Sequence, residues 1–346
     1  MNDMLRKQIM MFLVILGCSQ LVMAESADST KLRPKFALEY TGELQTDFER
    51  IRWVHLLQLR AELPLTRQVT FNVSSISLAH SDEEPICYDL QGYSNIEAWN
   101  IPFILSVAGF TWQMNDSHSL FAGIRRIDED YFNSDGLALF VNSSCGGFPT
   151  IVGNFFTPAY PMASMGVHYV YDSERLGVQA SLYNGIGSYE FTGRYNIFRV
   201  CPKSDGIFAL AQAEYRHQNS HYFLGASVHD WDVLLLRERK LRPSVWTYAE
   251  QALSKRLTLL AAYSHAFSND EVCNNFYGIG GRYACKNLEF GLFSDYTRIL
   301  EIDEWATELT CKLGLSNSLS LQPALHIIKT DNETQCIGMM RLNISL

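Results

Sequence analysis

Residues 303–314, with the sequence DEWATELTCKLG, alternate between apolar and polar side chains along their length. In an extended chain Trp305 and Leu309 fall on one face, whereas Glu304 and Glu308 fall on the other. Because successive side chains of a β-strand point to opposite sides, this period of two predicts a strand with one apolar and one hydrated face. The same pattern recurs through most of the chain and therefore decides the fold class.

The alternating segments predict β-strands from residue 36 to the end of the sequence. They lie at 36–49, 53–63, 68–80, 103–113, 118–127, 163–173, 175–184, 190–199, 206–217, 220–230, 244–254, 256–267, 274–285, 287–296, 303–314, 317–329 and 335–346. Bacterial single-chain barrels have an even number of strands, so we expect one segment to be wrong and sixteen strands to remain. The segment 190–199 has the weakest pattern.

The connections between these segments have two different lengths. Short turns are expected at 64–66, 115–117, 172–174, 218–219 and 316–317, and longer stretches at 81–102, 128–162, 231–243, 268–273 and 330–334. Short turns at one end and longer loops at the other are typical of outer-membrane barrels. We therefore predict an all-β protein with one domain over residues 25–346, which forms a transmembrane antiparallel β-barrel of about sixteen strands.

The composition agrees with a sheet that lies between lipid and water. Aromatic residues make up 12% of the chain and charged residues 19%, below the roughly 25% of an average soluble domain. The formal net charge of −9 argues against a nucleic-acid partner. Beyond Gly17 no apolar run approaches the roughly 20 residues of a membrane-spanning helix, so a membrane could be crossed only by a closed barrel.

Residues 1–24 have the features of an export signal. Two basic residues precede the apolar run 9–17, and small residues suited to cleavage end at Ala24. We expect removal of residues 1–24. Cys18 lies in a sequence that loosely resembles a lipobox, so lipidation there is an alternative, and in both cases the chain leaves the cytoplasm.

The stretch 128–162 is too long and too aromatic for a simple connection. Loops beyond roughly 12–15 residues are usually functional or disordered, and the many aromatic side chains of this one need burial. A barrel of about sixteen strands encloses an aqueous channel, so the lumen is the place available for them. We expect this segment to fold inward and to form a constriction.

The expected constriction combines aromatic and charged side chains. Its candidate residues are Arg125, Arg126, Asp128, Glu129, Asp130, Tyr131, Phe132, Phe140 and Asn142. Glu39, Glu43, Arg60, His168 and Gln179 are expected on the lumen wall. Alternation directs Arg125 toward the lumen, whereas Arg126 is expected at the rim. Aromatic faces can bind sugar rings while polar groups orient the hydroxyls; for each residue, solvation of the wall or fixing of the loop is the alternative role.

Residues 118–186 also resemble a known protein family. The matching segments are LFAG at 120–123, DEDYF at 128–132, FVNS at 140–143, MGVHY at 165–169 and GVQASLYNG at 177–185. They are similar to carbohydrate-selective porins of the OprB type. This resemblance implies a β-barrel channel, narrowed by inward loops, through which small carbohydrates diffuse across the bacterial outer membrane.

We expect neither enzyme activity nor a cofactor or metal site, since GxSxG and HExxH motifs are absent. The cysteines beyond Cys18 form no CxxC pair, so we expect apolar fillers with at most one loop disulfide. The expected partners are small carbohydrates, membrane lipids and lipopolysaccharide, and the chain is a monomer or a homotrimer.

Three alternatives stay open. A general or anion-biased porin is compatible with Arg125 and Arg126. An outer-membrane hydrolase would use His168 or His326. A secreted glycan-binding β-sandwich would bury its apolar faces between two sheets. A basic cluster, expected in an external loop, consists of Arg237, Arg239, Lys240 and Arg242.

Overall fold

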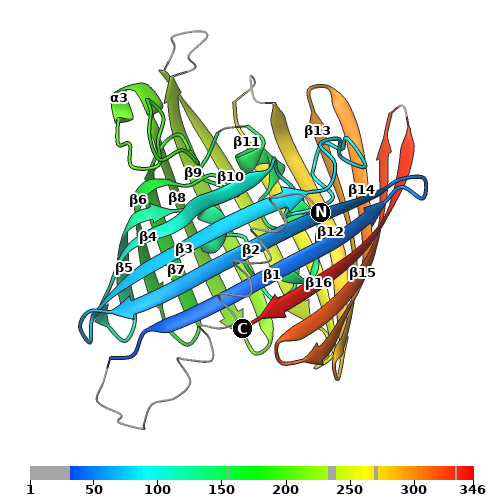
Figure 1. Cartoon of the computed structure of the whole chain (residues 1–346), viewed down its shortest axis with the longest axis horizontal. Helices are drawn as coiled ribbons and strands as arrows, with labels where there is room; N and C mark the ends of the chain where they lie inside the picture. The colour runs from blue at the N-terminus through cyan, green and yellow to red at the C-terminus, as the bar shows by residue number, and fades with distance from the viewer. Residues whose placement is uncertain (1–31, 155, 233–238, 269–271, 332) are drawn as a thin grey trace. The chain divides into compact units, whose positions relative to one another are not determined.

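The computed structural model describes residues 32–154, 156–232, 239–268, 272–331 and 333–346. In this part of the chain sixteen antiparallel strands pair in sequence order and close into a barrel (Figure 1). Their bounds are β1 Lys35–Thr46, β2 Ile51–Pro64, β3 Val69–His80, β4 Ile101–Asn115, β5 His118–Arg125, β6 Ser164–Asp172, β7 Leu176–Asn184, β8 Ile207–His217, β9 Ser220–Asp232, β10 Arg239–Ala252, β11 Leu257–Ala266, β12 Cys273–Cys285, β13 Leu288–Ile299, β14 Ile302–Ser316, β15 Leu319–Thr330 and β16 Thr334–Ser345. The predicted sixteen-stranded barrel is confirmed. The expected signal segment 1–24 lies outside the described residues.

The first and last strands close the barrel. Glu39 of β1 lies opposite Ser345 of β16 in an antiparallel ladder. Beyond it, Leu38 and Leu346 exchange two backbone hydrogen bonds of 2.9 Å. Closure leaves neither β1 nor β16 as an open sheet edge, which is what a sheet in hydrocarbon requires because its backbone groups must be paired internally.

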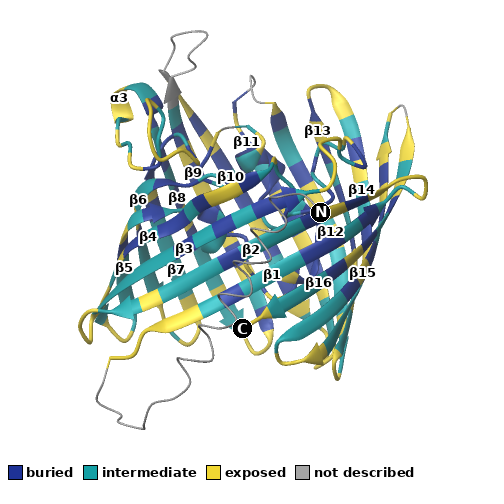
Figure 2. Cartoon of the chain, in the orientation of Figure 1, coloured by how far each residue is buried: buried dark blue, intermediate teal, exposed yellow. Residues whose placement is uncertain are grey.

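The two faces of the wall have opposite polarity. Figure 2 shows bands of buried, intermediate and exposed residues along the strands. On β14, Trp305 and Leu309 are each 54% exposed on the outer face, whereas Glu304 and Glu308 on the inner face are 0% and 1% exposed. A soluble protein has the reverse arrangement. An apolar exterior around a polar interior is the arrangement of a membrane-spanning barrel, and the alternation predicted for 303–314 is confirmed.

The predicted strand at 190–199 is wrong. These residues belong to the connection between β7 and β8, which also contains the short helix α3 (Pro202–Asp205). Gly193 has a φ of 92°, a conformation that interrupts an extended chain. Nearby, the Nε of Arg199 donates to Asp205 over 2.7 Å. Local contacts of this kind fold the segment as a loop, which leaves sixteen strands.

Part of the predicted external loop at 231–243 belongs to strands, which corrects the prediction for Arg239, Lys240 and Arg242. Strand β10 begins at Arg239, and Arg242 faces the interior opposite His229 with 7% exposure. Lys240 is likewise a strand residue, and Arg237 lies outside the described residues. Pro243 obscured this part of β10 in the sequence, because proline is uncommon within paired strands.

Two long connections of the described chain fold into the barrel. The first inner loop, residues 81–100, joins β3 to β4. The second inner loop, residues 126–163, joins β5 to β6. Its helical turns are η1 (Ile127–Glu129), η2 (Leu137–Leu139), η3 (Ser143–Cys145) and α2 (Pro149–Val152). The predicted inward folding of 128–162 is therefore confirmed, whereas the inward folding of the first loop was not foreseen.

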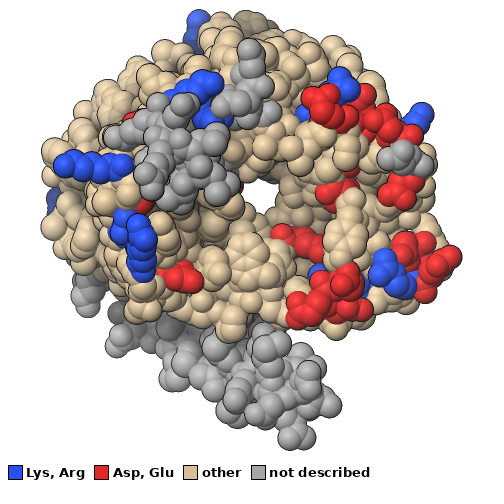
Figure 3. All heavy atoms as spheres, turned by 90° about the horizontal axis from the view of Figure 1, so that it is seen from above, with Lys and Arg blue, Asp and Glu red and all other residues tan. Residues whose placement is uncertain are grey.

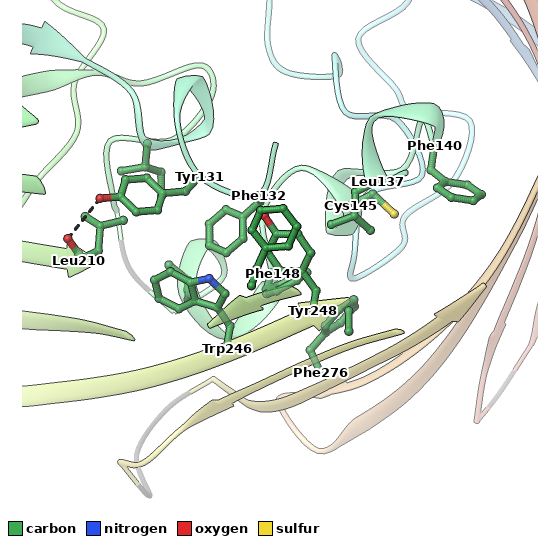
Figure 4. Close-up of a cluster of buried hydrophobic side chains, with 14 of the residues drawn as sticks. Tyr131, Phe132, Leu137, Phe140, Cys145, Phe148, Leu210, Trp246, Tyr248 and Phe276 are labelled. Atoms are coloured by element: carbon green, nitrogen blue, oxygen red, sulfur yellow. Dashed lines mark hydrogen bonds between the residues drawn. The ribbon is translucent and has the colours of Figure 1, made fainter. Parts of the chain in front are cut away.

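An aromatic cluster holds the second inner loop against the wall (Figure 4). Phe132 packs on Trp246 of β10 with 5.2 Å between ring centroids, and Phe148 stacks on Phe276 of β12 at 5.0 Å. These four side chains are at most 2% exposed. Burial of each such side chain contributes about 1.5–3 kcal/mol, so the cluster stabilises the loop inside the lumen.

Candidate functional site

Carboxylates of the inner wall bind the backbone of both loops. Glu250, Glu304 and Glu308 accept hydrogen bonds of 2.8–3.1 Å from backbone N–H groups. Glu308, for example, accepts from the N–H groups of Val141 and Asn142. Backbone N–H groups buried away from water need an acceptor, so these glutamates fix the course of the loops across the lumen.

The two inner loops are also joined to each other. The N–H of Asn95 donates to the carbonyl of Val141 over 2.7 Å, and the N–H of Ser143 donates to the carbonyl of Gly92 over 2.7 Å. Gly92 and Asn95 belong to the first inner loop, and Val141 and Ser143 belong to the second. The loops therefore form one constriction, made of residues 81–100 and 126–163.

Charged side chains of β1, β2 and β16 anchor the first inner loop. Glu97 forms an ion pair with Arg52 of β2. The hydroxyl of Ser94 donates to Glu43 over 2.7 Å, and Glu43 also accepts from the Nε of Arg341 over 2.7 Å. Glu43 is thus on the lumen wall, as predicted. Arg52, Ser94 and Glu97 were missed. The length of the 81–102 connection was the sequence signal for Ser94 and Glu97, whereas Arg52 is in phase with the polar residues Gln58 and Arg60 of the same strand.

A cavity of about 380 Å³ lies between the inner loops and β2. Its polar lining includes Asn95, Glu97, Asp128, Asn133 and Ser143, and its aromatic lining includes Phe132, Phe140 and Tyr160. The volume falls within the roughly 300–1,000 Å³ of small-molecule pockets. Figure 3, which views the barrel from above the longer loops, shows an opening through its middle with acidic side chains nearby.

Three of the predicted constriction residues line this cavity, namely Asp128, Phe132 and Phe140. Burial raises the pKa of the Asp128 carboxyl, although the charge of Arg126 acts in the opposite direction. Asp128 also accepts a hydrogen bond of 2.9 Å from the N–H of Tyr160, so one carboxylate both shapes the loop and lines the cavity.

Arg125 faces the lumen as predicted, but its charge is already paired. Its guanidinium forms an ion pair with Asp130 and lies 4.9 Å from the ring centroid of Phe121. Arg126 is 5% exposed rather than at the rim, which corrects the prediction. It pairs with Glu129 at 2.6 Å. Both guanidinium groups are therefore neutralised by the acidic residues that follow them in the chain.

Other predicted constriction residues hold the loop rather than line the cavity. Tyr131 is fully buried, and its hydroxyl donates to the carbonyl of Leu210 over 3.2 Å (dashed in Figure 4). The side chain of Asn142 accepts a 2.9 Å hydrogen bond from the N–H of Cys145 and so caps η3. The contacts of Tyr131 and Asn142 therefore agree with the alternative role, in which these side chains fix the loop.

The predicted wall residues all lie on the inner face, where the strand register places them. Arg60 pairs with Glu129 at 3.0 Å and lies 3.9 Å from Glu39. The side chain of Gln179 donates to the carbonyl of Asp130 over 2.8 Å. These contacts attach the base of the second inner loop to the wall.

Asp130, His168 and Ser181 lie in the order of a hydrolase triad. The ring of His168 is 3.5 Å from Asp130 and 2.7 Å from the Ser181 hydroxyl. A catalytic serine must reach a substrate carbonyl beside oxyanion donors. Ser181 is 7% exposed, and its oxygen also contacts the hydroxyl of buried Tyr131 at 2.9 Å. The arrangement therefore suits a structural network; His326 is 2% exposed and equally inaccessible.

Among the described residues, none of Cys87, Cys145, Cys201, Cys273, Cys285, Cys311 and Cys336 forms a disulfide. The sequence allowed at most one loop disulfide, and this part of the chain contains none. Within the same residues no group of three His, Cys, Asp or Glu side chains is placed to hold a metal ion. The described helices are also too short to span a bilayer.

No family model matches the sequence, and no curated protein matches it either. Solved structures do match. The high-pH structure of OprB from Pseudomonas putida aligns with a TM-score of 0.76 at 16% identity, over 90% of this chain and 94% of that one. The fold is that of a porin. The outer membrane channel DcaP of Acinetobacter baumannii aligns at 0.60 with 11% identity, over 93% of this chain and 100% of that one.

A mutant of the porin from Rh. blastica aligns at a TM-score of 0.61 with 9% identity, over 91% of this chain and 100% of that one. Identities this low establish a shared porin fold alone. At that level the resemblance of residues 118–186 to OprB-type porins is confirmed, and the sandwich alternative is excluded by the closed barrel.

Proposed function

We propose that the protein is a passive channel of the bacterial outer membrane through which small, uncharged carbohydrates diffuse. The closed barrel with an apolar exterior supports a position in that membrane, in contact with lipids and lipopolysaccharide. The porin fold and the resemblance of residues 118–186 to carbohydrate-selective porins support transport rather than enzyme activity.

The observation that carries carbohydrate selectivity is the composition of the 380 Å³ cavity. Phe140 and Tyr160 offer aromatic surface for the C–H groups of a sugar ring. Asn95 and Asp128 offer an amide and a carboxylate for its hydroxyl groups. Contacts that are individually weak suit transport, because a bound solute must be able to leave again.

The anion-biased alternative loses its main support in this geometry. It relied on Arg125 and Arg126, and both are ion-paired with acidic residues. A free guanidinium in the channel would attract anions, whereas a paired one adds little to the net potential there. We therefore favour a neutral solute.

The test is ion-current recording in planar bilayers with a panel of monosaccharides and disaccharides. We expect single-channel currents that fall as sugar is added, since a bound sugar obstructs ions in the constriction. Ion current that no sugar reduces would indicate a general porin. Hydrolysis of esters or phospholipids by the purified barrel would instead support the hydrolase alternative.

A further inference from the structure

A second, smaller cavity of about 130 Å³ lies on the inner wall, where the base of the second inner loop meets β6 to β9. Asp130 and Asn133 of the loop line it, together with Gln179, Gln212, Glu214 and Arg216 of the wall. Glu214 and Arg216 are near the short turn that joins β8 to β9. This cavity, here called the exit niche, therefore lies toward the short-turn end of the barrel.

Asn133 connects the exit niche to the larger cavity, because it lines both. The preceding residue, Phe132, has a φ of 58°, an uncommon left-handed conformation for a residue other than glycine. This turn of the backbone buries Phe132 in the aromatic cluster and leaves Asn133 exposed in the lumen. A side-chain amide has two N–H donors and a carbonyl acceptor, so Asn133 can bind a hydroxyl group in either cavity.

The groups of the exit niche suit a neutral solute with several hydroxyls. Glu214 and Asp130 are carboxylates that accept hydrogen bonds from hydroxyl groups. Arg216 lies 2.9 Å from Glu214, so its charge is largely compensated. Phe223, 6% exposed, contributes an apolar surface. The lining holds three carboxylates, Asp130, Asp172 and Glu214, against the single guanidinium of Arg216, so an anionic solute is disfavoured there.

Gly177 keeps the exit niche open. A Cβ atom added at this position of β7 would lie 2.8 Å from the Nη2 atom of Arg216 and 3.2 Å from Glu214. Any larger side chain would thus enter the space between these groups. The constriction cavity would be unaffected, because Gly177 does not line it.

We propose that the exit niche is a second binding site for neutral polyhydroxylated solutes and that Asn133 transfers the solute between it and the constriction. This inference rests on the proposed function. A solute would leave the 380 Å³ cavity while already in contact with the next set of hydrogen-bonding groups. Adjacent weak sites allow passage without one tight complex.

The inference is tested by filling the niche. Gly177→Val suits a strand and places a branched side chain in the niche. The matched control is Ser320→Val, which adds the same side chain on the inner face of β15, on the far side of the barrel. Glucose and glucose phosphate are added separately to each end of single channels, and the concentration that halves the current is measured.

Gly177→Val should raise the half-blocking concentration of glucose added at the short-turn end about fivefold, the effect of losing one or two hydrogen bonds. Ser320→Val should leave it unchanged. Asn133→Ala should raise it from both ends, because Asn133 lines both cavities. Glu214→Gln, which keeps the size of the side chain, should weaken block from the short-turn end if Gly177→Val does not assemble.

Equal block of wild type and Gly177→Val from the short-turn end, in barrels with normal heat-modifiable mobility, would overturn the exit niche. Glucose phosphate that blocks from that end as well as glucose would overturn its preference for neutral solutes. If glucose and the other sugars fail to block the wild-type channel from either end, the proposed function itself is wrong. The two failures are therefore distinguishable.

Discussion

At the scale of single residues, the docking of the second inner loop depends on a glycine that leaves room for a buried tryptophan. A Cβ atom added at Gly225 of β9 would lie 2.1 Å from the indole ring of Trp246. Trp246 is 1% exposed and packs on Phe132. The glycine therefore provides the space in which the aromatic cluster forms.

Gly225→Val should displace Trp246 and loosen the second inner loop, because overpacking a close-packed core costs about 1–3 kcal/mol. We expect a lower Tm and noisier, larger single-channel conductance. Gly281→Val is the control, since a Cβ atom there would have only ordinary contacts of 3.5 Å or more. Equal Tm and conductance of the two variants would show that Gly225 is not needed for loop docking.

At the scale of structural elements, both inner loops narrow the channel. The second inner loop contributes the aromatic cluster, and the first contributes Glu97 and Asn95. Their mutual backbone hydrogen bonds, such as Asn95 to Val141, make each loop support the other.

Replacing residues 133–156 with a short flexible linker should raise the single-channel conductance and reduce block by sugars. This segment carries Phe140 and Phe148 and much of the cavity lining, so its loss widens the lumen. Far-UV circular dichroism and heat-modifiable mobility would check that the barrel still assembles. An unchanged conductance in an assembled barrel would contradict a constriction role for the loop.

The first inner loop should respond to pH through Asp89. Burial, reinforced by the charge of Glu304, raises the pKa of the Asp89 carboxyl to about 7, against about 3.9 in an unfolded chain. Between about pH 4 and pH 7, the Asp89 carboxyl is therefore protonated in the docked loop and ionised in the undocked loop. Docking is favoured at the acidic end of this window and weakens as the pH rises through about 7.

We accordingly expect faster amide hydrogen exchange in residues 81–100, after correction for the intrinsic pH dependence, at about pH 8 than at about pH 6. Asp89→Asn should abolish the difference, whereas Asp82→Asn, at an exposed position of the same loop, should retain it. A pH dependence that survives in Asp89→Asn would assign the effect to another group.

At the scale of the whole molecule, the charge distribution predicts a preference for cations among small ions. The chain carries a formal net charge of −9, and Arg125 and Arg126 are neutralised by their acidic neighbours. We expect a reversal potential that favours K⁺ over Cl⁻ in a KCl gradient. The preference should decline at high salt, because screening shortens the range of exposed charges. A preference for Cl⁻ would restore the anion-biased alternative.

Much of the barrel could be predicted from the sequence, because alternation is a local property of the chain. A period of two assigns each side chain to one face, so the outward position of Trp305 and the inward positions of Glu308 and Arg125 follow without knowledge of the partners. The strand predicted at 190–199 was wrong because the scattered aromatic residues of this loop produce a pattern similar to the weak alternation of a strand.

The sequence by itself determined the sixteen-stranded β-architecture, the polarity of its two faces and the inward folding of the aromatic segment, since each follows from local pattern and the need to bury apolar surface. Only the tertiary structure decided that residues 81–100 complete the constriction, that Arg126 is buried and that Asn133 lines two cavities. These features depend on contacts between segments brought together by closure of the barrel, such as Asn95 with Val141, and no periodicity within a strand encodes them.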